Sequence, residues 1–354
     1  MPQVIEKFKK VWEVFQETRQ ISRVLHNESI FKFLQQFSDH CMKEKNRGGF
    51  DQYLKDYRAI GKIKIEKDWH QDSSSGEGRL LYSNSLFSKG CLRVKLDSRD
   101  RALIVFLPGY RMDAADVLER EDHFQNISGI AQSLQMGLAC WDWPLQGPRL
   151  EKGLYLKLKS VYSAEREYSR ILPNLGTSLW REFVAELQFA LSHLRRYVGL
   201  LDVHVIGWSM GGCFSYLAPL LEPSITKVVS AGSCAAIKDL LEEGKTRLHG
   251  YFFYPLNSLH YFDLENIVEK VILQKHPLLI IHGDRDAGCL DRTRRLVLEK
   301  VNRKGLHLEV LKNHGHVFSA SMKSRIKCFL ENPVEVGQRL ENKHEKVEVG
   351  FLKG

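Results

Sequence analysis

The segment Val203-His204-Val205-Ile206-Gly207-Trp208-Ser209-Met210-Gly211-Gly212 carries the strongest structural signal in the chain. Residues 203–206 are typical of a short buried strand, and residues 212–218 are typical of the first turns of a helix. A Gly-x-Ser-x-Gly pentad between a strand and a helix forces a sharp turn that exposes the serine hydroxyl on a strained backbone. Its glycines keep the two elements from colliding. We therefore interpret Ser209 as a nucleophile.

Other parts of the chain supply the partners that such a serine needs, in a fixed order. Two apolar runs typical of buried parallel strands, and a third strand-like segment, are each followed by residues rich in glycine, histidine or aspartate. They are Ala102–Leu107 before Pro108-Gly109-Tyr110-Arg111, Pro277–Ile281 before His282-Gly283-Asp284-Arg285-Asp286, and Leu306–Leu311 before Asn313-His314-Gly315-His316-Val317-Phe318.

These four ordered motifs resemble the α/β-hydrolase superfamily, over roughly residues 79–331. The resemblance implies a Ser-His-Asp triad in which Ser209 is the nucleophile, His316 the general base and Asp286 the orienting acid. It also implies an oxyanion hole made by the backbone N–H groups of Tyr110 and Met210. Pro108 stands where the family usually has histidine, but the oxyanion donor is a backbone group, so the chemistry is retained.

The triad assignments have competitors nearby in the sequence. His314 competes with His316 for the base, and Asp284 competes with Asp286 for the acid, although we expect Asp284 to cap its turn. Asp142, after another strand, is a further candidate acid. His314 and His316 could also suggest a metal pair, but the triad accounts for them without a third ligand. We therefore expect no metal and no organic cofactor.

A finer resemblance is to the acetyl xylan esterase and cephalosporin C deacetylase branch. It is carried by the segment His260-Tyr261-Phe262-Asp263 and by the Pro108-Gly109-Tyr110 loop. The chain departs from that branch at Met210, where glutamine is usual. The branch implies small acyl groups. Trp208 and Trp143, with Trp141, are candidates to line an acyl pocket, although tryptophans beside strands are usually core residues.

Composition sets broad limits on the function. The chain is 43% hydrophobic and 27% charged, which is ordinary for a globular protein. Its net charge of +9 comes without an arginine-rich tract, so we expect no nucleic-acid partner. Seven scattered cysteines indicate reduced thiols. The first residues show no signal-peptide core and no apolar run could span a bilayer, so the prediction is a cytoplasmic protein.

Strands that alternate with helices predict a mostly parallel central sheet flanked by helices, the α/β-hydrolase fold. The predicted body covers residues 76–335, with lid-like insertions near 143–176 and 235–275. Residues 1–75 are predicted as a helical extension packed on the body, with a boundary at the polar segment 72–78. Basic and aromatic side chains alternate in its first helices, which leaves peripheral membrane contact as an alternative. Residues 336–354 are predicted as a polar tail.

The function predicted from these features is hydrolysis of small-molecule carboxylic esters through an acyl-enzyme intermediate. The same triad also serves thioesterases, lysophospholipases and acyltransferases, because fold and triad do not choose the leaving group. A non-catalytic binding protein on the hydrolase scaffold is a further alternative, and a homo-oligomer is compatible with all of them.

Overall fold

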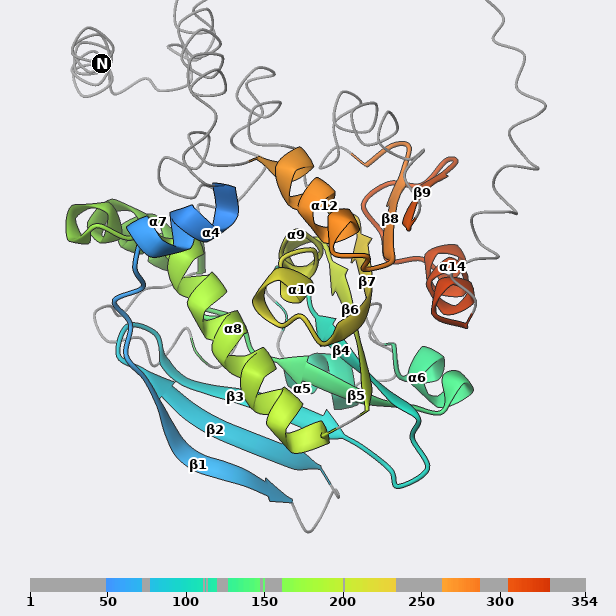
Figure 1. Ribbon diagram of the computed structural model, residues 1–354, viewed down its shortest axis with the longest axis horizontal. Coiled ribbons are helices and arrows are strands. Elements are labelled where there is room, and N and C mark those ends of the chain that lie inside the picture. Colours follow the sequence, from blue (N-terminus) through green and yellow to red (C-terminus); the bar gives the residue numbers. More distant parts are fainter. Residues whose placement is uncertain are drawn as a thin grey trace, which may run out of the picture.

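The computed structural model describes residues 49–71, 77–110, 112, 114–119, 127–146, 149, 161–199, 201–233, 263–286 and 305–331 (Figure 1). The strands are β1 (Ile63–Gln71), β2 (Gly78–Asn84), β3 (Ser88–Lys95), β4 (Ala102–Leu107), β5 (Met136–Trp141), β6 (Asp202–Trp208), β7 (Ile225–Ala231), β8 (Leu278–Gly283) and β9 (Leu306–Leu311). The helices are α4 (Gly49–Asp56), α5 (Ala114–Glu119), α6 (Ser128–Leu134), α7 (Val161–Ile171), α8 (Leu179–Val198), α9 (Met210–Ser215), α10 (Ala218–Leu221), α12 (Leu264–Leu273), α14 (Ala320–Glu331) and the 3₁₀-helix η2 (Leu172–Leu175).

In the described part of the chain the strands form one sheet in the order β1-β2-β3-β5-β4-β6-β7-β8-β9. Strands β1, β2, β3 and β5 pair antiparallel in succession. From β5 to β9 every neighbouring pair is parallel. The predicted mostly parallel sheet is therefore present. Because the strand order reverses around β4, the carboxyl ends of β4 and β6 lie side by side, which is where ligands bind in such sheets.

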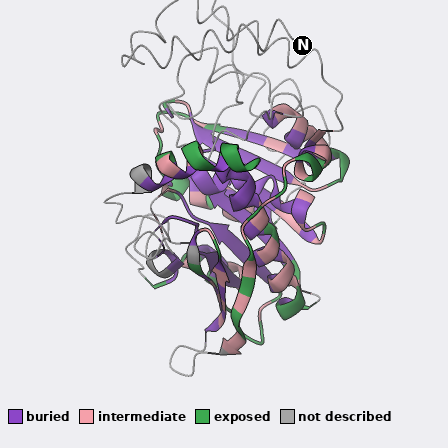
Figure 2. Ribbon diagram, turned by 90° about the vertical axis from the view of Figure 1, so that its left-hand side faces the viewer, coloured by how far each residue is buried: buried purple, intermediate pink, exposed green. Residues whose placement is uncertain are grey.

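Helices cover both faces of this sheet. Along β4, Leu103, Val105 and Leu107 pack into one hydrophobic cluster, which also holds residues of α4, α7, α8, α9 and α12. The alternate residues Ile104 and Phe106 pack into a second cluster with residues of α5, α6 and α14. Both clusters are buried, and Figure 2 shows buried residues concentrated in the strands and on the inner sides of the helices. Burial on both faces explains why every residue of β4 is apolar.

Helix α8 has a serine at its start and a glycine after its end. The side chain of Ser178 accepts a hydrogen bond from the backbone N–H of Arg181, and Gly199 follows the last turn with φ at +64°. A serine N-cap and a glycine with positive φ after the last turn are common helix boundaries. The apolar stripe between them is buried against the sheet, and α8 and α6 lie on opposite sides of it (Figure 1).

One prediction about the organisation of the chain needs correction. Residues 63–71 form strand β1, which pairs with β2, so the predicted boundary near residue 75 falls between two paired strands rather than between an extension and a body. The described part of the predicted lid-like insertion 143–176 contains α7 and η2. Residues 1–48, most of the insertion 235–275 and the tail 336–354 lie outside the described residues.

Candidate active site

Ser209 lies in a sharp turn between β6 and α9. Its backbone has φ at 52° and ψ at −113°, in a region that non-glycine residues rarely occupy. The turn is held from both sides, because the Ser209 N–H donates to the Ala231 carbonyl at 2.9 Å and the Ser209 carbonyl accepts from the Cys213 N–H at 3.2 Å. A backbone held in such a conformation costs energy and is characteristic of functional sites.

Gly207 and Gly211 allow this turn, as the pentad predicts. A Cβ on Gly207 would lie 2.1 Å from the carbonyl oxygen of Gly211, so any side chain would push the strand and the helix apart. A Cβ on Gly211 would lie 1.9 Å from the carbonyl oxygen of Leu107, at the end of β4. The backbone after the serine therefore contacts the backbone that enters residues 108–110, which we call the oxyanion loop.

The three predicted triad residues come together at the carboxyl ends of β6, β8 and β9. The His316 Nε2 atom lies 2.8 Å from the Ser209 Oγ, and its Nδ1 atom lies 2.9 Å from the Asp286 Oδ2. The Asp286 side chain is 1% exposed, whereas the His316 side chain is 45% exposed. The imidazole thus joins a buried carboxylate to a hydroxyl at the surface, a geometry in which it can accept the hydroxyl proton.

Asp284 holds the turn rather than the histidine ring. Its Oδ1 accepts from the His314 N–H at 3.2 Å. The backbone N–H groups of Asn313 and His314 hold the pKa of Asp284 below its usual value. The ring of His314 instead contacts the Lys312 carbonyl through Nδ1, at 2.7 Å. Asp286 and His316 therefore contact each other through their side chains, whereas Asp284 and His314 contact backbone groups of the turn.

The loops after β8 and β9 are joined along their backbones. The Asp284 N–H donates to the Leu311 carbonyl at 3.0 Å, and the Arg285 N–H donates to the His314 carbonyl at 2.9 Å. A Cβ on Gly283 would lie 2.0 Å from the His314 carbonyl oxygen, so only glycine permits this approach. These contacts hold the acid and the base at a fixed separation.

Trp208 supports the histidine ring from below. The two rings stack with centroids 4.8 Å apart, and the indole also packs on Phe318. The six-membered ring of Trp208 also lies against Gly232, where a Cβ would be 2.4 Å from the indole. Trp208 is 2% exposed and Trp143 is fully buried, so both belong to the core as the structure stands. Their predicted role in substrate binding remains a prediction.

The oxyanion loop begins beside the serine turn. Met210 is the first residue of α9, and the first N–H groups of a helix have no acceptor within the helix. Tyr110 follows the Leu107 and Pro108 peptides that pack on Gly211. The Pro108 carbonyl accepts a hydrogen bond from the indole N–H of Trp143 at 2.8 Å. The structure thus places the two segments that carry the predicted donors next to each other.

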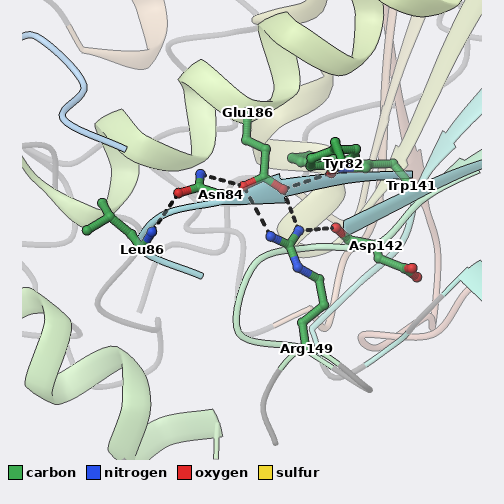
Figure 3. Close-up of polar contacts among 7 residues, drawn as sticks. All are labelled: Tyr82, Asn84, Leu86, Trp141, Asp142, Arg149 and Glu186. Carbon is green, nitrogen blue, oxygen red and sulfur yellow. Dashed lines mark hydrogen bonds and ion pairs between the residues drawn. The ribbon is translucent and has the colours of Figure 1, made fainter. Parts of the chain in front are cut away.

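A buried polar cluster behind the site was not predicted from the sequence (Figure 3). Glu186 on α8 is fully buried and accepts hydrogen bonds from Tyr82 at 2.8 Å and Asn84 at 2.9 Å. It also pairs with Arg149. Arg149 in turn donates to the backbone carbonyl of Asp142 at 2.8 Å. The sequence signal for this cluster was present, since Glu186 interrupts the apolar stripe of α8 between Phe183 and Leu187.

Asp142, the third candidate acid, has a different partner. Its Oδ1 accepts from the backbone N–H of Ala114, the first residue of α5, at 2.8 Å. Among the described residues no group of three or more histidine, cysteine, aspartate or glutamate side chains could hold a metal ion. Within the same residues no helix is long and apolar enough to cross a bilayer.

Comparison with known proteins gives matches of structure only. No protein-family model matches the sequence, and no curated protein matches it. The solved structure of acetyl xylan esterase 1 from a Thermoanaerobacterium species matches with 17% identity and a TM-score of 0.52, over 83% of this chain and 92% of that one. An S-formylglutathione hydrolase from Agrobacterium tumefaciens matches with 17% identity and a TM-score of 0.49, over 78% and 99% of the two chains. Est1E from Butyrivibrio proteoclasticus matches with 14% identity and a TM-score of 0.44, over 70% and 95%.

Proposed function

The chain has the α/β-hydrolase fold, and we propose that it is a serine hydrolase that cleaves carboxylic esters through an acyl-enzyme intermediate. One observation carries the proposal. His316 contacts Ser209 and Asp286 through its two ring nitrogens, at 2.8 and 2.9 Å, and the serine sits in a strained turn. A serine hydroxyl is a poor nucleophile at neutral pH and needs such a base.

In the proposed first step, Ser209 Oγ attacks the ester carbonyl while His316 Nε2 accepts the hydroxyl proton. Asp286 holds the Nδ1–H tautomer and stabilises the imidazolium that forms. The negative oxygen of the tetrahedral intermediate accepts hydrogen bonds from the backbone N–H groups of Met210 and Tyr110. His316 then donates its proton to the departing alkoxide, and the acyl group stays on Ser209 as an ester.

Water completes the cycle by the same route. His316 removes a proton from the water molecule as it attacks the acyl-enzyme, and a second tetrahedral intermediate occupies the oxyanion hole. Its collapse breaks the bond to Ser209 Oγ, and His316 returns the proton to the serine. The exposed histidine ring is compatible with access of water to this position. No cofactor takes part in the proposed reaction.

The reaction class is tested with a fluorophosphonate, which forms a covalent adduct only with an activated serine. Intact-protein mass spectrometry should show one adduct on the wild type and none on Ser209→Ala. A wild-type protein that is folded yet unlabelled would contradict the proposal and favour a binding protein on this scaffold.

The leaving group is tested separately, because the triad itself accepts several. Matched p-nitrophenyl esters and acyl thioesters of two to twelve carbons would be compared by kcat/KM. A preference for short esters would support the resemblance to the acetyl xylan esterase branch. A preference for thioesters, or transfer of the acyl group to an added alcohol, would indicate the thioesterase or acyltransferase alternative. Hydrolysis of a lysophospholipid in vesicles would indicate the lysophospholipase alternative.

A further inference from the structure

Two consecutive residues that follow β5 bind the backbone on either side of Tyr110. At the start of the oxyanion loop, the indole N–H of Trp143 donates to the Pro108 carbonyl at 2.8 Å, and both groups are buried. At the first residue of α5, the Asp142 carboxylate accepts from the Ala114 N–H at 2.8 Å. The backbone before Tyr110 and the backbone after it are therefore hydrogen-bonded to one dipeptide.

The dipeptide is held in turn by the buried ion pair of Arg149 and Glu186 (Figure 3). Arg149 donates to the Asp142 carbonyl, and its guanidinium also donates to Glu186 on α8. Glu186 accepts further hydrogen bonds from Tyr82 and Asn84 of β2. Burial and the neighbouring Glu186 charge raise the pKa of Tyr82 well above its usual value, so its hydroxyl keeps the proton that it donates. A buried charge with this many hydrogen bonds is rigid.

A second contact reaches Tyr110 itself from α7. The Tyr110 hydroxyl donates to the Oε2 of Glu165 at 3.1 Å. Glu165 is fully buried, and its Oε1 accepts from the Gln146 side chain at 3.4 Å. Tyr110 is the residue whose backbone N–H is assigned to the oxyanion hole. Glu165 therefore fixes the Tyr110 side chain through its hydroxyl, and Trp143 fixes the backbone two residues earlier through the Pro108 carbonyl.

We propose, on the premise that Ser209 is the nucleophile, that Trp143 and Glu165 are positioning residues which aim the Tyr110 N–H at the oxyanion. Trp143 acts through the Pro108 carbonyl, which fixes the plane of the peptide entering the loop. Glu165 acts through the Tyr110 hydroxyl. Donors of an oxyanion hole must stay within about 0.5 Å and 10–20° of their productive position, and such precision needs supporting contacts of this kind. Neither residue touches the substrate in this proposal.

Trp143→Phe removes the indole N–H and keeps an aromatic ring. We expect kcat for an activated ester to fall about tenfold to a hundredfold with KM changed less than about twofold, because a misplaced donor weakens binding of the transition state and not of the ester. Trp69→Phe is the control for replacing an indole by a phenyl ring. Trp69 lies on the edge strand β1 and stacks on Tyr197 of α8, with ring centroids 4.1 Å apart. Its kcat should stay within about twofold of the wild type.

Tyr110→Phe tests the second contact with a smaller change. It removes only the hydroxyl and retains the backbone N–H, so we expect a fall in kcat without a matching rise in KM. Tyr168→Phe is its control, because Tyr168 on α7 donates its hydroxyl to the Leu86 carbonyl, away from the loop. Both tyrosine variants lose one hydrogen bond and should lose similar stability. If Trp143→Phe fails to fold, the Tyr110 pair still decides the question.

Amide hydrogen exchange of the peptide that spans residues 108–114 gives a readout that does not depend on catalysis. Faster exchange in Trp143→Phe and Tyr110→Phe, but not in their controls, would support the proposal. Wild-type exchange and wild-type kcat in both variants would overturn it, as would faster exchange with unchanged kcat. If fluorophosphonate fails to label the wild type while the variants still exchange faster, the loop is anchored as described and the proposed function alone is wrong.

Discussion

Gly211 lies so close to Leu107 that a Cβ on the glycine would be 1.9 Å from the leucine carbonyl oxygen and 2.5 Å from its carbon. The contact joins the backbone that follows the nucleophile to the backbone that precedes the oxyanion loop. Because both partners are main chain, neither can turn aside as a long side chain could. The distance between the two predicted oxyanion donors therefore depends on residue 211 having no side chain.

Gly211→Ala should move the serine turn and the oxyanion loop apart. We expect kcat to fall at least about 100-fold, the effect of removing one oxyanion donor. Overpacking at such a site also destabilises the fold, by about 1–3 kcal/mol. The measurements are kcat on an activated ester and the free energy of unfolding in urea, made on the same preparation.

Gly129→Ala is the control for a glycine replaced inside a helix. Gly129 lies in α6, and a Cβ there would meet nothing within 4 Å. Alanine should therefore stabilise the protein by about 0.5–1 kcal/mol and leave kcat unchanged. Wild-type activity in Gly211→Ala would contradict the assignment of the oxyanion hole to these two segments.

Asp286→Asn and Asp284→Asn should differ sharply although the two residues are two positions apart. Asparagine at 286 cannot stabilise the imidazolium and favours the wrong tautomer of His316, so kcat should fall by about 10⁴. Asparagine at 284 keeps an oxygen that can accept from the His314 N–H, so most activity should remain. Steady-state kinetics of both variants under one set of conditions checks the pair, and the opposite ranking would exchange the two roles.

The sequence predicted the parallel strands and the triad because both leave local signals. A strand buried on both faces is mostly apolar, as in β4 and in the first four residues of β8, and this pattern can be recognised without knowing the neighbouring strands. Each predicted triad residue follows a strand-like segment, so the order of motifs was sufficient to select Ser209, His316 and Asp286. The choice of His316 over His314 depended on the resemblance, and His316 is the ring that contacts both Ser209 and Asp286.

Strand β1 was missed for a physical reason. It lies at the edge of the described sheet, most of its side chains are at least partly exposed, and charged residues separate its few apolar ones. Its pairing with β2 is irregular between Ile65 and Lys67 and again between Lys67 and His70. These irregularities break the alternation that identifies a strand. Pairing with β2, rather than local sequence, fixes its conformation.

The polar contacts behind the site join residues far apart in the chain. Glu186 and Tyr82 are 104 residues apart, and Tyr110 and Glu165 are 55 apart. No sequence motif predicts that these residues meet, because the distance between their side chains is set by how α7 and α8 pack on the sheet. A charged residue within an apolar helical stripe is the feature that marks such a cluster in advance, since buried charges are rarely left unpaired.

Glu186→Gln should destabilise the protein strongly. The fully buried carboxylate compensates the Arg149 charge and accepts from Tyr82 and Asn84. A neutral glutamine amide leaves the positive charge of Arg149 without a partner charge. Its NH₂ group would also face the hydrogen-bond donors that now bind the carboxylate. Breaking a buried ion pair by removing one partner costs about 3–5 kcal/mol, which urea unfolding would measure.

An exposed ion pair provides the comparison for Glu186. Arg170 pairs with Glu167 on α7, where the two side chains are 72% and 26% exposed. Exposed pairs contribute about 0–1 kcal/mol, so Arg170→Ala should change the unfolding free energy little. Equal losses in the two variants would mean that the Arg149 and Glu186 pair is solvated in solution.

His204 should make the stability of the fold depend on pH. It is buried in β6 with its Nδ1 atom 2.7 Å from the Thr226 hydroxyl. Burial, assisted by the Lys227 charge, lowers the pKa of His204 from 6.5 to about 4. Between these values the unfolded chain binds a proton that the folded chain does not, so stability falls as the pH is lowered from 6.5 to 4. The full effect is about 3 kcal/mol.

His204→Gln removes this titration and retains a hydrogen-bonding side chain. The difference in unfolding free energy between wild type and variant should be constant above pH 7.5, where it reports packing alone. Below pH 6.5 the wild type should lose stability faster than the variant. All other titrating groups are present in both proteins, so their contributions cancel in the difference between the two unfolding free energies. Urea unfolding at half-unit steps from pH 4 to 8 checks this. Parallel curves would mean that water reaches the His204 ring and that β6 is less tightly covered at this point than the structure shows.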